Sequence, residues 1–143
     1  MRCYTNFKIV PEKNLIIEYF SGTINLDEII KLKYLESKDP HFCPDFNIID
    51  DSRDAEFLLN EKDIKQYINI LSNNELFVGK RNAAYLTKTP HQVVIATLFD
   101  LLKKELPLNI KIVSTLDAAL QWLGILKEKE LIEFYLSLLK VQE

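Results

Sequence analysis

The feature that most restricts the fold is a short run, Leu15–Phe20, that is apolar at nearly every position. Such a run is typical of a β-strand that is covered on both faces. It follows the alternating run Phe7–Val10 after four residues, Pro11–Asn14, and a connection this short favours an antiparallel hairpin. We expect Ser21-Gly22 to end the second strand. The chain therefore opens with a β-hairpin whose second strand is buried.

Three further runs have the composition of strands, and amphipathic helical segments separate them. These runs are Phe46–Asp50, Asn82–Leu86 and Ile110–Val113. With the hairpin they predict the order ββαβαβαβα with one extra helix. Strands that alternate with helices pair in parallel through right-handed crossovers. The predicted fold class is therefore α/β, with a single mixed five-stranded sheet opened by an antiparallel hairpin, βαβ units after it, and helices packed on the sheet.

Capping and breaking residues mark the boundaries of the first four helices. The start at Thr89 is the clearest, because Pro90 suits the first helical position and Gln92 completes a capping box. Such a cap contributes about 1 kcal/mol, which sets a boundary without deciding the fold. The other expected caps are Asn25, Asn60 and Thr115, and the expected ends are Asp39-Pro40, Pro107 and Gly124. A last helix is expected over about residues 128–141.

Each of these four helices carries apolar residues at helical spacing, which predicts its inward face. The expected inward residues are Leu26, Ile29, Ile30 and Tyr34 in the first helix, Ile64, Tyr67, Ile68 and Leu71 in the second, Val94, Leu98, Leu101 and Leu102 in the third, and Leu116, Ala119, Leu120 and Leu123 in the fourth.

The last helix is apolar over more of its circumference than one contact with the sheet requires. We expect Leu131, Tyr135 and Leu138 to pack on the sheet. Ile132 and Leu136 would then point away from it. Because exposed apolar patches often mark interfaces, this face predicts a homodimer formed through the C-terminal helix.

Length, charge and cysteine content narrow the class of protein. The 143 residues suit one domain, so we expect a single domain over residues 1–143 with 125–143 as an appended C-terminal helix. The 18 Lys and Arg against 21 Asp and Glu give a net charge of −3, which argues against a nucleic-acid partner.

The lack of an 18-residue uncharged apolar stretch predicts no membrane span. With no export signal, Cys3 and Cys43 are expected to be reduced thiols of a cytoplasmic protein.

Few residues of the chain suit catalysis or cofactor binding. The 3 glycines are too few and too scattered for a dinucleotide fingerprint or a P-loop. Of the 2 histidines, we expect His91 to be a polar surface residue at a helix start. His41 lies close to Cys43, but a closed zinc site needs four ligands. We therefore expect no catalytic residue, no cofactor and no metal site.

The densest polar cluster is Asp50–Asp54, directly after the third predicted strand. Sites in open α/β sheets are built at the carboxyl ends of strands, and adjacent acids there could hold Mg²⁺ or accept protons. The plainer interpretation is a solvated loop whose Asp and Ser side chains cap backbone donors. As a surface for a partner protein we select this loop and the next helix start, with the residues Asp50, Asp51, Ser52, Arg53, Asn60 and Glu61.

Over about residues 7–124 the chain resembles the STAS or SpoIIAA-like domains, in particular their small stand-alone bacterial members of uncharacterised function. The resemblance rests on the strand that ends in Ser21-Gly22, on the strand that leads into Asp51-Ser52, and on Ser114–Leu123. This last segment is similar to the family ending S-x-x-E-A-L-x-W-L.

The resemblance implies a non-enzymatic regulatory role. Anti-sigma-factor antagonists of this family bind a kinase and are switched by phosphorylation of a serine in a D-S-S-G-like motif. The corresponding stretch here, Leu58–Lys62, has neither the serine nor the glycine, and Glu61 already supplies a negative charge. Ser52, the nearest hydroxyl, lies earlier in the chain. The phosphorylation switch is therefore not carried over to this chain.

Three functions follow as hypotheses. The first is a cytoplasmic regulatory or protein-interaction module, which the family likeness and the scarcity of catalytic residues favour. The second is a carrier of a small apolar ligand held between helices and sheet, which the surplus of apolar residues on the helices favours. The third is a metal-dependent enzyme that uses Asp50 and Asp51.

Overall fold

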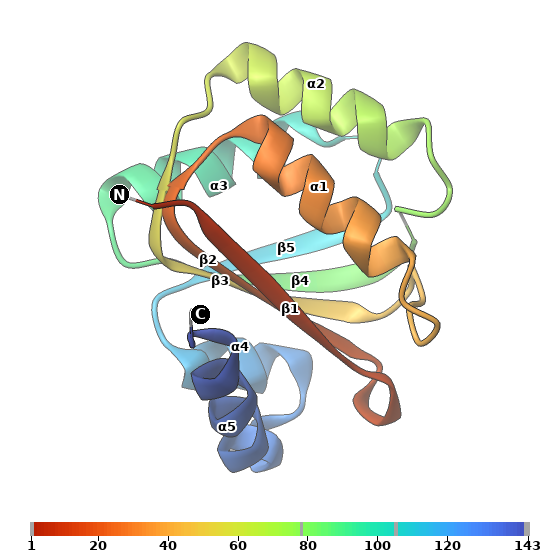
Figure 1. Ribbon diagram of the computed structural model, residues 1–143, viewed down its shortest axis with the longest axis vertical. Coiled ribbons are helices and arrows are strands. Elements are labelled where there is room, and N and C mark those ends of the chain that lie inside the picture. Colours follow the sequence, from red (N-terminus) through yellow and green to blue (C-terminus); the bar gives the residue numbers. More distant parts are fainter. Residues whose placement is uncertain (1, 78, 105, 142–143) are drawn as a thin grey trace.

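The computed structural model describes residues 2–77, 79–104 and 106–141, and its centre is a five-stranded sheet in the order β1-β2-β3-β4-β5 (Figure 1). The strands are β1 (Tyr4–Val10), β2 (Leu15–Ile24), β3 (Asn47–Phe57), β4 (Arg81–Leu86) and β5 (Leu108–Val113). β1 runs antiparallel to β2, and the other neighbouring pairs are parallel. The predicted mixed α/β sheet with an opening hairpin is confirmed.

Helices cover both faces of the sheet. They are α1 (Leu26–Ser37), α2 (Glu61–Ser72), α3 (Pro90–Leu102), α4 (Leu116–Leu123) and α5 (Lys129–Leu139), with 3-10 turns at Pro11–Lys13 and Leu126–Glu128. In Figure 1, α1, α2 and α3 lie on one face of the sheet, and α4 and α5 lie on the other. Two apolar cores result, and all six residues of Leu15–Phe20 are buried between them, as the apolar run predicted.

The four predicted helix starts are also confirmed. Asn25, Asn60, Thr89 and Thr115 each accept a hydrogen bond from a backbone N–H of the first turn. Gly124 ends α4 with a φ of 75°, in the left-handed region that glycine adopts without strain. Of the predicted C-terminal segment 125–143, residues 142 and 143 lie outside the described residues. No helix in the described ranges is both long enough and apolar enough to span a membrane.

Two strands are longer than predicted. β2 does not end at Ser21-Gly22 but continues to Ile24, because Gly22 adopts a φ of 75° inside the strand. A Cβ atom at Gly22 would lie 1.8 Å from the carbonyl oxygen of Arg2, so only glycine lets the N-terminal segment pass this closely. β3 extends beside β2 as far as Phe57. The segment Asp50–Asp54 is therefore part of a strand, and the prediction of a solvated loop is wrong.

The inward faces are correct for α2 and α4 and partly wrong for α1 and α3. In α1 the buried residues are Ile29, Leu32 and Glu36, whereas Tyr34 is exposed. In α3 the buried residues are Gln92, Ala96 and Phe99, whereas Val94 and Leu101 are exposed. Both helices carry apolar side chains on several sides, so spacing alone does not select the buried face.

The predicted face of α5 is wrong as well. Ile132 and Leu136 are buried in the core between α5 and the sheet, together with Leu139 at the same helical spacing. Phe134 and Leu138 are the exposed apolar residues, at 57% and 53%. Ile132 and Leu136 therefore cannot form a self-association surface, because their side chains are used inside the protein.

Candidate functional site

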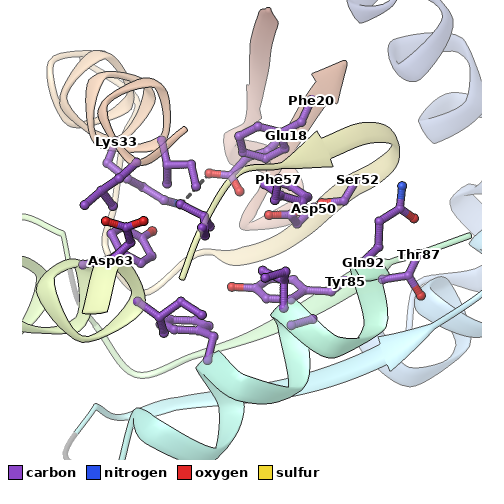
Figure 2. A pocket seen from close by; sticks show the side chains of 18 residues that line it. Glu18, Phe20, Lys33, Asp50, Ser52, Phe57, Asp63, Tyr85, Thr87 and Gln92 are labelled. Carbon is purple, nitrogen blue, oxygen red and sulfur yellow. Dashed lines mark hydrogen bonds and ion pairs between the residues drawn. The ribbon is translucent and has the colours of Figure 1, made fainter. Parts of the chain in front are cut away.

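A row of polar side chains crosses the middle of the sheet, beneath α1, α2 and α3. Glu18 of β2 is the register partner of Asp50 of β3, and Asp50 is the register partner of Tyr85 of β4. Register partners on parallel strands point to the same face. Figure 2 shows Glu18, Asp50 and Tyr85 facing one interior space. Three central strands thus each place one polar group at the same level of an otherwise apolar layer.

Helices α1 and α2 add polar groups from above the row. The Nζ atom of Lys33 lies 2.5 Å from Oε2 of Glu18 and 3.7 Å from Oε1 of Glu36. The side chain of Glu18 is 1% exposed and that of Lys33 is 12% exposed, so the ion pair lies in the interior. Tyr67 of α2 lines the same space. An interior ion pair is tolerated when its geometry is good, as the short distance here provides.

The carboxyl groups around Lys33 differ in protonation. Burial acts to raise the pKa of Glu18, but the charge of Lys33, the hydrogen bonds with Glu36 and Lys33 and the charge of Arg81 together lower that pKa below its usual value. Burial and the charge of Glu18 raise the pKa of Glu36 well above its usual range. Burial and the same charge raise the pKa of Asp50 to about 8. At neutral pH the cluster therefore holds the Glu18–Lys33 ion pair and a protonated Asp50, while the pKa of Glu36 is shifted upward as well.

The row forms the floor of a pocket between the sheet and the three helices. The pocket has a cavity volume of about 70 Å³. Its polar lining residues are Glu18, Lys33, Asp50, Ser52, Asp63, Tyr67, Tyr85, Thr87 and Gln92. Its apolar lining residues are Phe20, Leu26, Ile29, Phe57, Leu59, Ile64, Ile95, Ala96 and Phe99. Half of the lining residues are apolar, and enclosed pockets that combine apolar walls with placed polar groups are the usual form of a small-molecule site.

An open groove of about 830 Å³ adjoins the pocket at the far end of β3. Phe57, Leu59, Asp63 and Gln92 line both spaces, so the groove leads to the mouth of the pocket. The exposed residue His91 stands in the groove, with its Nε2 atom 2.9 Å from the carbonyl oxygen of Phe57. The site therefore lies where the carboxyl end of β3 meets the starts of α2 and α3.

Gln92 holds this end of the site together. Its Oε1 atom accepts hydrogen bonds from the backbone N–H groups of Lys88 and Thr89, at 2.6 and 3.1 Å. Its Nε2 atom donates to the carbonyl oxygens of Arg53 and Ala55, at 3.1 and 2.8 Å. One buried side chain thus joins the start of α3 to the extended part of β3.

The predicted cluster is distributed over both faces of the sheet, and β3 has a β-bulge within it. Tyr19 pairs with Asp51 but Ser21 pairs with Asp54, so β3 carries one extra residue at this point. Asp50 and Ser52 point into the pocket, where the Ser52 hydroxyl donates to Oδ1 of Asp50. Asp51 is buried but does not line the pocket, and its carboxylate accepts two hydrogen bonds from the Arg53 guanidinium, both at 2.9 Å. Alternation along the strand therefore separates Asp51 from Asp50 and Ser52, and the bulge changes the register of the residues that follow.

The helix-start residues selected as a partner surface have different environments. Asn60 caps α2 in a box with Asp63 and lines the groove. Glu61 is exposed and lies 3.8 Å from Lys65 on the same helix. Of the six selected residues, the structure brings Asp50 and Ser52 to the pocket and Arg53 and Asn60 to the groove. Asp51 and Glu61 line neither space.

Sequence reasoning missed most of the pocket's polar groups, namely Glu18, Lys33, Tyr67, Tyr85 and the clamping role of Gln92. A signal for Glu18 was present, because it is the one charged residue in a run predicted to be buried on both faces. A charge at such a position must be paired, since an isolated buried charge is too costly. The search for its partner leads to a lysine on the helix that follows.

The metal hypothesis based on Asp50 and Asp51 is not compatible with this geometry. Successive residues of a strand point to opposite faces of the sheet. Asp50 faces the pocket, whereas Asp51 is paired with Arg53. The two carboxylates therefore cannot hold one ion together.

Comparisons with known proteins bear on the fold. No family model matches the chain, and no curated protein matches it. The structure is similar to the crystal structure of an uncharacterized protein from the DUF3478 family with a SpoIIAA-like fold, from Shewanella loihica PV-4. The TM-score is 0.55 and the identity 11%, and the match covers 85% of this chain and 93% of the other. Together with the confirmed order of strands and helices, this match shows that the chain has a SpoIIAA-like fold.

Proposed function

We propose that this protein is a cytoplasmic, non-enzymatic binding module that holds a small, largely apolar molecule in the pocket between its sheet and α1–α3. The pocket carries this proposal, because nine of its 18 lining residues are apolar and polar groups from the sheet and from the helices face the same space. The mouth of the pocket lies at the carboxyl end of β3, the end of the strands at which open α/β sheets place ligands.

The absence of catalysis is part of the proposal, and the side chains of the pocket support it. A nucleophile needs a base within hydrogen-bond reach. The one hydroxyl beside an acid, that of Ser52, donates to Asp50, whose pKa of about 8 leaves it protonated and not basic at neutral pH. Lys33 is held in an ion pair by Glu18, so it is not a free amine.

The test is native mass spectrometry of the purified protein, combined with a variant that fills the pocket. Ala96 of α3 is buried and lines the pocket, so Ala96→Leu places three further carbon atoms inside it. We expect bound small-molecule mass on the wild type and none on Ala96→Leu. The control is Thr97→Leu, which adds bulk on the same helix outside the pocket. A wild type that carries no ligand in several preparations and binds none of the probes below would refute the proposal.

A second function, self-association, is supported by the outer face of α5. Phe134 and Leu138 lie one helical turn apart, and both are more than half exposed. Exposed large apolar side chains at this spacing are common at interfaces. We propose that this face, and not Ile132 with Leu136, joins two copies of the chain. Sedimentation at high concentration should show a dimer for the wild type and a monomer for the double variant Phe134→Ser, Leu138→Ser. A wild-type monomer at all concentrations would exclude it.

A further inference from the structure

We propose that the pocket is selective for a ligand with a positively charged end, a small aliphatic ammonium, whose charge binds Asp50 and whose carbon chain lies against the aromatic wall. This inference rests on the proposed function, because it names the chemical class that the pocket would hold. Four features of the pocket support it: its charge, the environment of Asp50, its aromatic residues and its volume.

The pocket has more negative than positive groups. Three of its lining residues, Glu18, Asp50 and Asp63, carry carboxyl groups, and Lys33 is the one cation among them. The Lys33 ammonium is committed to Glu18, at 2.5 Å, and its next carboxyl contact is Glu36, at 3.7 Å. Once Asp50 is ionised, above its pKa of about 8, a cation that enters the pocket meets uncompensated negative charge and an anion is repelled.

Asp50 is the carboxyl group of the pocket floor that has no cationic partner, since Glu18 is paired with Lys33. Among the residues that the structure describes, no lysine, arginine or histidine nitrogen lies within 4.0 Å of its oxygens. Its hydrogen bond in the described ranges comes from the Ser52 hydroxyl to Oδ1, which leaves Oδ2 for a ligand. Figure 2 shows the carboxyl group of Asp50 turned toward the centre of the pocket, between Glu18 and Tyr85.

Aromatic rings surround the space above Asp50. Phe20 and Phe57 stand at one side with ring centroids 5.8 Å apart, and Phe99 stands at the other, 5.5 Å from Tyr67 and 6.3 Å from Tyr85. The faces of such rings attract organic cations and also accept a carbon chain. The cavity volume of about 70 Å³ suits only a small ligand.

The protonation of Asp50 agrees with a missing counter-ion. Titratable groups from several elements face the pocket floor around Asp50. They are Glu18 of β2, Lys33 and Glu36 of α1, Tyr67 of α2, Arg81 and Tyr85 of β4, and Asp51 of β3. The lining residues from α3 are Gln92 and apolar side chains. Burial and the charge of Glu18 raise the pKa of Asp50 to about 8, against the weaker effect of Lys33. A bound ammonium would favour the ionised form and displace the proton.

The experiment compares three probes of nearly equal size by isothermal titration calorimetry: n-butylammonium, 1-butanol and butyrate. At about pH 9, where Asp50 is ionised, we expect the wild type to bind butylammonium at least about tenfold more tightly than 1-butanol. Butyrate should bind more weakly than either probe. Below about pH 6 the preference for the amine should shrink, because Asp50 must then lose a proton on binding.

The variant Asp50→Asn separates the charge from the shape of the pocket. Asparagine has the size of a protonated aspartic acid, so the fold and the 1-butanol affinity should persist while the preference for the amine disappears. Asp117→Asn is the control, because it removes one negative charge from the exposed surface of α4, on the other face of the sheet. Its preference should match that of the wild type.

The outcomes distinguish this inference from the proposed function. If 1-butanol binds as tightly as butylammonium at about pH 9, the charge selectivity is wrong and the apolar pocket stands. If Asp50→Asn keeps the preference for the amine, the assignment to Asp50 is wrong. If none of the three probes binds the wild type, the selectivity has no basis, and the proposed function loses its support as well.

Discussion

Buried ionisable residues determine how this protein responds to pH and to substitution. The interior holds Glu18, Lys33, Glu36 and Asp50 on one face of the sheet, where burial penalises every charge that lacks a partner. Lys33 can neutralise one carboxylate, and the 2.5 Å contact shows that this is Glu18. The pKa values of the surplus carboxyl groups are raised, that of Asp50 to about 8. Stability should therefore depend on pH in a direction that can be derived.

The first prediction concerns Asp50→Asn. The pKa of Asp50 is about 8 in the folded protein against 3.8 for an ordinary aspartate, so the folded state binds more protons between these values. The wild type therefore loses stability as pH rises from about 4 to about 8, by a few kcal/mol, and the loss ends above that range. Asparagine does not titrate, so the variant lacks this loss. Urea unfolding from about pH 5 to about pH 9 should show that the free energy of unfolding of the variant increases relative to that of the wild type as pH rises. If the free energies of unfolding of the two proteins change with pH in the same way, the prediction is wrong.

The second prediction concerns the interior ion pair. Lys33→Met leaves Glu18 without a counter-charge in an interior position, and the free energy of unfolding should fall by about 3–5 kcal/mol. Adding Glu18→Gln to the same chain should restore a large part of this loss, because the unpaired charge is removed. The control is Lys65→Met, whose exposed pair with Glu61 should contribute less than about 1 kcal/mol. Equal losses in the single and double variants would show that the charge is not the cause.

Helix α3 is positioned by its first turn more than by its apolar residues. Gln92 is 4% exposed and uses both ends of its amide, so it fixes the rotation of α3 and its distance from β3 together. Ala96 and Phe99 follow Gln92 on the same side, which brings them to the pocket wall. Val94 and Leu101 are turned outward as a consequence, although both are apolar.

The third prediction concerns this clamp. Gln92→Ala removes one acceptor and one donor and leaves four backbone groups without their side-chain partner, so the free energy of unfolding should fall by about 2–4 kcal/mol. Gln121→Ala, on the exposed side of α4, is the matched control and should change stability by less than about 0.5 kcal/mol. Chemical denaturation measures both. If the two variants lose the same amount, the hydrogen bonds of Gln92 do not hold β3 and α3 together.

The two faces of the sheet have different roles in the whole molecule. The face under α1–α3 carries the polar row and the pocket, whereas the face under α4 and α5 carries an apolar core that includes Ile132 and Leu136. The alternation of side chains along β3 contributes to this division, because it places Asp50 on the pocket side and Asp51 on the other. A rigid sheet with one closed face is a suitable support for a binding pocket on the opposite face.

The fourth prediction tests the packing of α5. Ile132→Ala should lower the free energy of unfolding by about 2–5 kcal/mol, because it leaves a cavity beneath the helix. Phe134→Ala, two residues away on the outer side, should change the stability of the monomer by less than about 0.5 kcal/mol. Thermal and urea unfolding of the two variants at low protein concentration give the comparison. A larger loss for Phe134→Ala would mean that the helix is turned the other way.

The order of strands and helices, the hairpin and the four capped helix starts could all be predicted from the residues, since turns, caps and apolar spacing act within a few positions of the chain. Other features could not be predicted from the residues. They are the extent of β2 and β3, the inward sides of α3 and α5, and the grouping of Glu18, Lys33, Asp50 and Tyr85 in one pocket. Each of these depends on partners 15 or more positions away, on a strand register, and on which of several apolar faces gains the most from burial. Local chemistry set the elements, and contacts between distant segments set the site.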